Sequence, residues 1–228
     1  MDADAQVAPV AALVADPTRA TILFALSDGR ALPACDLALH AGVTAATISY
    51  QLEKLIAGRL VAADRQGRHR YYRLASSTVI GLLEALATVA APAPARTFRE
   101  GQEGKALRLA RTCYDHLAGQ LGVRIAEALL AGGCLAPSAR DYVLTPAGER
   151  LFRRLAVDVA GARSARRSFA RACLDWSERR HHLAGALGAA LLDRLFELGW
   201  IERTPSSRAV RLSDPGRRGL RAHFQIEI

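Results

Sequence analysis

The chain has 228 residues, half of them hydrophobic, and a formal net charge of +9. This length fits two small domains with sizeable cores better than one large domain, and the basic excess favours a polyanionic partner. Residues 1–16 lack the features of a secretory signal, and the longest apolar stretch, 79–91, is too short to span a bilayer. We therefore predict a cytoplasmic chain without a membrane partner, in which the four cysteines are reduced thiols.

Two short helices are predicted at the start of the chain. Residues 6–15 form an apolar helical segment. Asp16 followed by Pro17 predicts a break and a restart, because aspartate is a good helix cap and proline fits the first helical position. The second helix is expected over 18–26.

A helix-turn-helix is predicted next, with helices over 33–41 and 44–57 and a tight turn at Gly42. From Ile48 onward an apolar stripe repeats at i, i+4 and i+7, which indicates a core-facing side of the second helix. The polar side suits a helix that reads base edges in a major groove. The residues of this helix that we predict to contact DNA are Thr44, Thr47, Ser49, Tyr50, Gln51 and Lys54.

A two-stranded wing is predicted after this helix, with strands over 59–61 and 71–74 around a basic tip at 65–70. Such a tip suits contact with phosphates or a minor groove. The alternative is a solvated basic hairpin on an unrelated helical protein, but the period, turn, polar face and basic tip all agree with a winged helix. The wing residues predicted to contact DNA are Arg65, Arg68, His69 and Arg70.

Taken together, residues 15–26, 35–55 and 58–74 resemble the ArsR/SmtB family of bacterial winged-helix repressors. The resemblance extends over roughly residues 7–90. It implies a homodimer that binds a palindromic double-stranded DNA operator, with the first and last helices of the domain forming the dimer interface. Those helices correspond here to 7–14 and 79–89.

The metal-sensing sites of that family are not matched. Arsenic-sensing members carry a cysteine pair where this chain has Pro33 and Cys35, and one thiol is too few for a trithiolate site. Other members bind zinc through Asp and His on the last helix, where this chain offers Glu84. We therefore carry over neither site and expect Cys35 to be a small core residue.

The fold class predicted is mainly α with small β wings. We assign the winged helix-turn-helix to 1–91, a linker to 92–104 and a C-terminal helical domain to 105–228. The C-terminal domain contains an internal repeat, because HLAGQLG at 116–122 recurs as HLAGALG at 182–188. The two copies, about 105–160 and 165–228, each read as a degenerate winged-helix unit.

The repeat gives a second group of candidate residues. Cys113 and His116 are expected on one helical face, where an i, i+3 spacing can chelate a soft ion. The later copy supplies Cys173, His181 and His182, so a pseudo-two-fold would bring thiols and imidazoles together around a thiophilic or transition metal ion. The alternative is that the histidines and thiols pack at a helix crossing.

Two further patterns concern the same domain. The pairs Arg111/Asp115 and Arg171/Asp175 are expected on helix surfaces because their members are four residues apart. Aromatic residues would line a ligand pocket between the copies or, in the plainer interpretation, pack in the core. These are Tyr114, Tyr142, Trp176 and Trp200.

The sequence thus predicts a bacterial sequence-specific DNA-binding transcriptional regulator. We expect a homodimeric repressor released by a small ligand, a metal or a thiol-reactive signal. The alternative is a winged-helix protein-interaction module without specific DNA binding. The chain contains no Gly-rich phosphate loop, Ser-His-Asp order or carboxylate pair that indicates catalysis, so we do not expect an enzyme.

Overall fold

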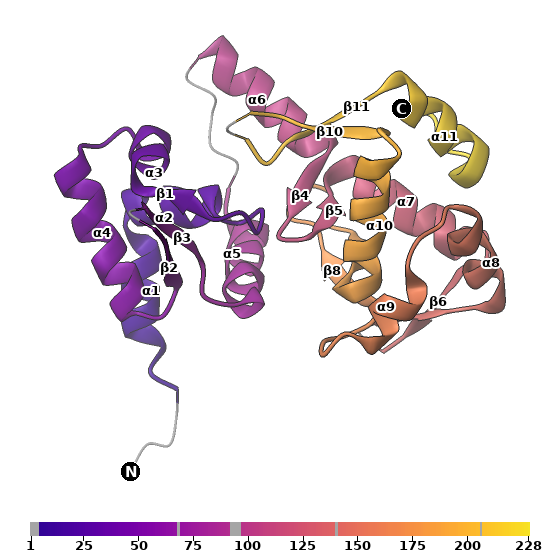
Figure 1. Cartoon of the computed structure of the whole chain (residues 1–228), viewed down its shortest axis with the longest axis horizontal. Helices are drawn as coiled ribbons and strands as arrows, with labels where there is room; N and C mark the ends of the chain where they lie inside the picture. The colour runs from indigo at the N-terminus through magenta and orange to yellow at the C-terminus, as the bar shows by residue number, and fades with distance from the viewer. Residues whose placement is uncertain (1–4, 68, 92–96, 140, 206) are drawn as a thin grey trace. The chain divides into compact units, whose positions relative to one another are not determined.

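The structure is a computed structural model that describes the chain except residues 1–4, 68, 92–96, 140 and 206. The chain folds as two compact units, Met1–Leu83 and Glu84–Ile228, which meet within one helix. In Figure 1 the first unit is coloured indigo to purple and the second magenta to yellow. Each unit is described by itself.

The N-terminal unit is a winged helix-turn-helix, as predicted. Its three-stranded sheet has the order β1-β3-β2, and aliphatic side chains from the helices form its core. The elements are α1 Val7–Ala15, α2 Pro17–Ala25, β1 Leu32–Pro33, α3 Ala34–Ala41, α4 Ala45–Ala57, β2 Val61–Gln66, β3 His69–Leu74 and the first part of α5 Ser77–Val89, which continues into the second unit.

Short-range signals in the sequence define these helix ends. The Asp16 side chain accepts a hydrogen bond of 2.9 Å from the Arg19 amide, and Pro17 begins α2. Gly42 ends α3 in the left-handed conformation, with φ of 63°, a backbone region that favours glycine. Thr44 caps α4 by accepting from the Thr47 amide. The predicted turn at Gly42 and the predicted helix cap at Thr44 are therefore confirmed.

The C-terminal unit contains the element order β-β-α-β-β-α twice. The first set is β4 Arg111–Cys113, β5 His116–Ala118, α7 Gly119–Ala131, β6 Leu135–Ser138, β7 Asp141–Leu144 and α8 Pro146–Arg154. The second is β8 Arg171–Leu174, β9 His181–Ala184, α10 Gly185–Glu197, β10 Ile201–Arg203, β11 Val210–Leu212 and α11 Asp214–Phe224. Helices α6 Phe98–Leu109 and α9 Val159–Ser164 precede the two sets.

Backbone hydrogen bonds join the two sets reciprocally. The Tyr142 amide donates to the Ala170 carbonyl at 2.7 Å, and the Val210 amide donates to the Ala110 carbonyl at 3.0 Å. Strands β6, β7, β8 and β9 form one antiparallel sheet. Helix α7 packs on β9 of the other set and α10 packs on β5, around one hydrophobic core that includes Leu121, Leu187 and Phe152.

One sequence prediction for this unit is wrong. Cys113 and His116 lie on the hairpin β4–β5 rather than on a helix, and the helix begins only at Gly119. Gly119 has a φ of +76°, and a Cβ there would lie 2.7 Å from the Arg108 carbonyl oxygen. This left-handed glycine interrupts the helical pattern. The predicted linker at 92–104 overlaps α6, while residues 92–96 lie outside the described part.

Among the described residues, no single helix is long and apolar enough to cross a membrane. Helices α1 and α2 reach the required length only as a pair bent by 88°.

Candidate functional site

The second helix of the helix-turn-helix, α4, has one buried and one exposed side. Ile48, Leu52 and Leu55 are at most 1% exposed and fix the helix against the unit's core. On the other side Ser49 is exposed, and Tyr50 is 54% exposed. A large exposed aromatic residue with a hydroxyl group is available to a partner surface.

Several polar groups of α4 are oriented by local contacts. The Thr44 and Thr47 hydroxyls lie 3.0 Å apart, and the Ser49 hydroxyl donates to the Ala45 carbonyl at 2.9 Å. The Lys54 ammonium lies 4.3 Å from the centre of the Tyr50 ring. This cation–π contact holds lysine and tyrosine together on one surface.

Gln51 occupies a different environment from the other predicted residues of this helix. It is half-buried, and its Oε1 accepts a hydrogen bond of 2.9 Å from Arg19 on α2. Arg19 also donates to the carbonyls of Leu13 and Ala12 at 2.7 and 2.9 Å. Gln51 is thus part of a connection that ties α1, α2 and α4 together.

The exposed side of α4 includes residues that the sequence did not single out. Ala46 and Glu53 lie on the side opposite the buried stripe, beside Tyr50 and Ser49. Angular position around the helix was the available signal, since residues opposite the apolar stripe face solvent. A carboxylate at Glu53 adds an acceptor to a surface that is otherwise neutral or basic.

The wing is longer and its tip tighter than predicted. Strands β2 and β3 pair from Val61 with Leu74 to Gln66 with His69, so the tip of the wing lies between Gln66 and His69. Arg65 and Arg70 are direct cross-strand partners and both are exposed, as is His69. Arg68 lies outside the described residues. The wing therefore presents basic side chains at its distal end.

Cys35 was expected in the core, and this expectation is wrong. The side chain is exposed at the start of α3, with its sulfur 3.4 Å from an Asp36 carboxylate oxygen. The first turn of α3 lies at the surface, and Leu37 is the residue of this turn that reaches the core.

The C-terminal unit brings four of the five predicted sensor residues together. Cys113, His116, Cys173 and His182 each offer a ligand atom, and these atoms all lie within 4.8 Å of one another. Three of the four residues are buried and Cys173 is partly buried. His181 is exposed and does not belong to this group, because neighbouring residues of a strand point to opposite faces. We call the four residues the Cys/His cluster.

Carboxylates lie behind both imidazoles of the Cys/His cluster. The two Nε2 atoms are 3.1 Å apart. On the other side of each ring, His116 Nδ1 lies 3.4 Å from Asp115 Oδ1, and His182 Nδ1 lies 3.3 Å from Asp175 Oδ2. The His182 contact has ion-pair distance but lacks hydrogen-bond geometry, and within the described residues this Nδ1 has no hydrogen-bond partner.

Asp175 is itself fixed by a buried network. Arg111 donates to Asp175 Oδ2 at 2.9 Å, and the side chains of both residues are fully buried. The Gly119 amide donates to the same oxygen at 2.7 Å, while Ser177 and Glu178 donate to Oδ1. The predicted pairs Arg111/Asp115 and Arg171/Asp175 are therefore wrong, because Arg111 pairs with the aspartate of the other segment.

These contacts shift the pKa values of the cluster. The Cys113 thiol donates to the Cys173 sulfur, which lowers the pKa of Cys173 and raises that of Cys113, and burial adds to the rise at Cys113. Burial alone would lower the pKa of His182, but the Asp175 carboxylate and the Cys173 sulfur raise it to about 9. These shifts favour the thiolate form of Cys173, the thiol form of Cys113 and the protonated form of His182.

The predicted aromatic pocket residues have varied environments. Trp200 is part of the core, Tyr142 packs against that core, and Trp176 lies under the Arg111 guanidinium at 4.5 Å. Tyr114 occupies the β4–β5 turn with a φ of 58°. None of the four lines either of the two cavities described next.

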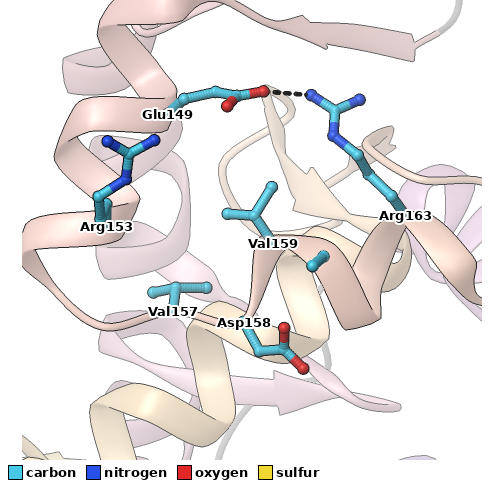
Figure 2. A pocket seen from close by; sticks show the side chains of 7 residues that line it. Glu149, Arg153, Val157, Asp158, Val159 and Arg163 are labelled. Atoms are coloured by element: carbon cyan, nitrogen blue, oxygen red, sulfur yellow. Dashed lines mark hydrogen bonds and ion pairs between the residues drawn. The ribbon is translucent and has the colours of Figure 1, made fainter.

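Two open cavities lie on the C-terminal unit. Figure 2 shows the first, of about 350 Å³, where Glu149 and Arg163 form an ion pair of 2.6 Å. The second, of about 440 Å³, includes Glu127, Leu151 and Phe224 in its lining. The first is bordered by charged side chains at the surface and contains no thiol or imidazole.

A helix-turn-helix followed by a basic two-stranded wing defines the winged-helix class of DNA-binding transcriptional regulators. The family described as "Bacterial regulatory protein, arsR family" matches this chain over residues 16–63. The chain is 43% identical over 222 residues to the "Uncharacterized HTH-type transcriptional regulator YdfF" of Bacillus subtilis, covering 97% of this chain and 98% of that relative. The chain belongs to the ArsR family of transcriptional regulators, which are not enzymes.

Other similarities concern the N-terminal unit. A "Transcriptional repressor SmtB homolog" from Synechocystis is 37% identical over 87 residues, which cover 38% of this chain and 65% of that protein. Among solved structures, the homodimeric winged helix-turn-helix DNA-binding domain Mb0332 from Mycobacterium bovis is 30% identical. The match covers 39% of this chain and 89% of the Mb0332 fragment, with a TM-score of 0.35.

Proposed function

We propose that this regulator is a homodimeric repressor that binds a specific double-stranded DNA operator through α4 and the wing. The observation that carries the proposal is the combination of an exposed polar side of α4, around Tyr50, with a wing whose end presents Arg65 and Arg70. Arginines on the wing would neutralise phosphates, while Thr47, Tyr50 and Ser49 would test base edges. A regulator acting on chromosomal DNA would work in the cytoplasm.

The wing is tested by removing its charge. Arg65→Ala/Arg70→Ala should weaken binding to every DNA sequence to a similar extent. It should also reduce the slope of log K against log salt by about 3.6, since the dimer loses four phosphate contacts and each contributes ~0.9. The matched control, Arg150→Ala/Arg218→Ala, removes the same charge from exposed positions on the C-terminal unit.

Fluorescence anisotropy with a labelled fragment of the chain's own promoter region gives both quantities. An unchanged salt slope in the wing variant would show that the wing does not contact DNA. If the unaltered protein shows no salt-sensitive binding at all, the protein-interaction module is the better description and the repressor proposal fails.

The homodimer is proposed to form through α1 and α5. Helix α1 is rich in valine and alanine, yet none of its residues is buried, and Val7 is 67% exposed. Leu86 and Val89 of α5 are 42% and 82% exposed. Apolar helix surfaces of this kind are typically covered by a partner.

Val7→Asp should shift the chain from dimer to monomer in sedimentation velocity. Leu39→Asp is the control, because Leu39 is 83% exposed but lies on α3, outside the proposed interface. A dimer that survives substitution of Val7, or that dissociates equally with Leu39→Asp, would contradict this interface.

We also propose that the C-terminal unit consists of two winged-helix-like repeats, about 105–160 and 165–228, and that it receives the releasing signal. The twofold element order and the reciprocal Tyr142–Ala170 and Val210–Ala110 hydrogen bonds support the repeats. The Cys/His cluster supports a metal or thiol-reactive signal, since its sulfur and nitrogen donors suit soft ions.

A further inference from the structure

We propose that Cys113, His116, Cys173 and His182 form a closed, four-coordinate site for one divalent ion of the zinc type. The inference rests on the effector site proposed above and names its ion class and coordination. Two ligands come from the hairpin β4–β5 and two from the hairpin β8–β9. A bound ion would therefore join the two halves of the C-terminal unit.

The distances in the cluster suit a tetrahedral ion. With Zn–N of about 2.0–2.1 Å and Zn–S of about 2.3 Å, the edges of the tetrahedron are ~3.3 Å between nitrogens and ~3.8 Å between sulfurs. The observed Nε2–Nε2 distance is 3.1 Å, and every pair among the four ligand atoms lies within 4.8 Å. Small side-chain rotations would bring all four atoms to bonding distance.

The carboxylates define which nitrogens face the ion. Asp115 and Asp175 lie beside the Nδ1 atoms of His116 and His182, at 3.4 and 3.3 Å, which leaves Nε2 as the ligating nitrogen of each ring. A bound cation would replace the hydrogen bond between the two Nε2 atoms, which lie 3.1 Å apart. A carboxylate behind each ligating imidazole is the usual arrangement in zinc sites.

Charge balance selects a divalent ion. Asp175 is paired with Arg111, and Asp115 is paired with Arg167, so the groups behind the ligands are neutral in sum. Two thiolates with a divalent ion are also neutral, whereas a monovalent ion would leave a net negative charge in a buried site. The donor set contains no carboxylate, which disfavours magnesium and calcium.

Each imidazole is also held by the opposite half of the unit. A Cβ on Gly188 of α10 would lie 3.2 Å from the His116 Cβ, and a Cβ on Gly122 of α7 would lie 3.6 Å from the His182 Cβ. Glycine at these two positions lets each helix approach the histidine of the other segment. All four coordination positions are filled by the chain, which is typical of structural or regulatory sites rather than catalytic ones.

The test uses the full chain, purified with a reductant and stripped with a chelator. Titration with Zn²⁺ against a chromophoric chelator should give one ion per chain. Co²⁺ should give the visible bands of a tetrahedral ion and thiolate charge-transfer absorption. Cys113→Ser, Cys173→Ser and His182→Asn should each weaken zinc binding at least 100-fold, and Asp115→Asn about 10–100-fold, because Asp115 orients His116.

Two matched controls are available. His181→Asn changes the exposed histidine next to His182, and Cys134→Ser changes a thiol outside the cluster, so both should bind zinc as the unaltered chain does. The Co²⁺ spectrum of the unaltered chain needs no variant and remains decisive if a ligand substitution prevents folding. An octahedral spectrum, the absence of binding, or full affinity in the Cys113→Ser/Cys173→Ser chain would overturn the site.

Mass spectrometry of the untreated chain distinguishes a metal site from a redox pair. A quantitative Cys113–Cys173 disulfide in the chain purified under reducing conditions would replace the metal site by a redox pair. The DNA assay separates this inference from the proposed function. Zinc binding without any change in operator affinity would support the metal site but contradict its role as the effector site. Operator binding without zinc binding would contradict the metal site and leave the DNA-binding proposal intact.

Discussion

Replacing Arg111 by methionine tests the buried network behind the Cys/His cluster. Arg111 and Asp175 are both fully buried, so the substitution leaves a carboxylate without its counter-charge. Removing one partner of a buried pair typically costs about 3–5 kcal/mol. Asp175 keeps four hydrogen bonds from Gly119, Ser177 and Glu178, which places the loss near the lower end of that range.

Arg111 also lies over the Trp176 ring at 4.5 Å. Losing this contact adds about 0.5–1 kcal/mol. We therefore expect Arg111→Met to reduce the free energy of unfolding of the C-terminal unit by about 3–4 kcal/mol. This reduction corresponds to roughly 100- to 1000-fold in the folding equilibrium.

Tryptophan fluorescence isolates the relevant unit. Trp176 and Trp200 are the two tryptophans of the chain, and both lie in the C-terminal unit. Urea unfolding followed by their emission, in a buffer containing a chelator, reports that unit without any contribution from a bound ion. Arg211→Met is the control, because its pair with Glu202 is exposed and should leave the midpoint nearly unchanged.

A double-mutant cycle completes the test. Arg111→Met/Asp175→Asn removes both charges, so it should be less destabilised than the sum of the single variants. A loss below about 1 kcal/mol for Arg111→Met, or additive single and double variants, would refute the argument that the pair is energetically coupled in the interior.

Three further outcomes are expected. Gln51→Ala should destabilise the N-terminal unit by about 1.5–3 kcal/mol in circular-dichroism melts, because Arg19 loses an acceptor. If Gln51 also reads a base, the substitution will change the binding free energies of operator variants by ~1–3 kcal/mol at one position. Arg19→Ala will not change that base preference. Gly119→Ala should destabilise the C-terminal unit by more than 1 kcal/mol, because the backbone there has a positive φ and the added Cβ would clash with the Arg108 carbonyl oxygen. The control Gly104→Ala lies on α6, where the added Cβ would meet nothing within 4 Å, and should be neutral or stabilising. Thr145→Ala should cost about 1 kcal/mol by urea unfolding, since its hydroxyl caps α8; no change would mean that the cap is replaced by water.

The sequence by itself determined the N-terminal unit. The cap at Asp16, the turn at Gly42, the cap at Thr44 and the apolar stripe from Ile48 are all short-range signals, and each has the predicted structure. Such signals are readable because the residues that interact lie within one or two helical turns of each other. The wing was predicted too, although its strands proved longer than the alternation indicated.

The partners in the C-terminal unit were decided by tertiary structure. The repeat named Cys113, His116, Cys173 and His182 as a possible group, but the helix predicted for the first pair is a hairpin. An HLAG segment followed by leucines at a spacing of four fits a helix locally. The first three residues form a strand because the glycine that ends the segment is left-handed, and the backbone packed against that glycine leaves no room for a side chain.

The partner of Arg111 was also decided by the tertiary structure. Four-residue spacing indicated Asp115 as its partner, whereas the folded chain pairs it with Asp175, 64 residues away. Local spacing describes surface pairs, whose energies are small. A charge that the core buries must find its counter-charge wherever the chain brings one into the same low-dielectric region, and sequence separation does not limit that choice.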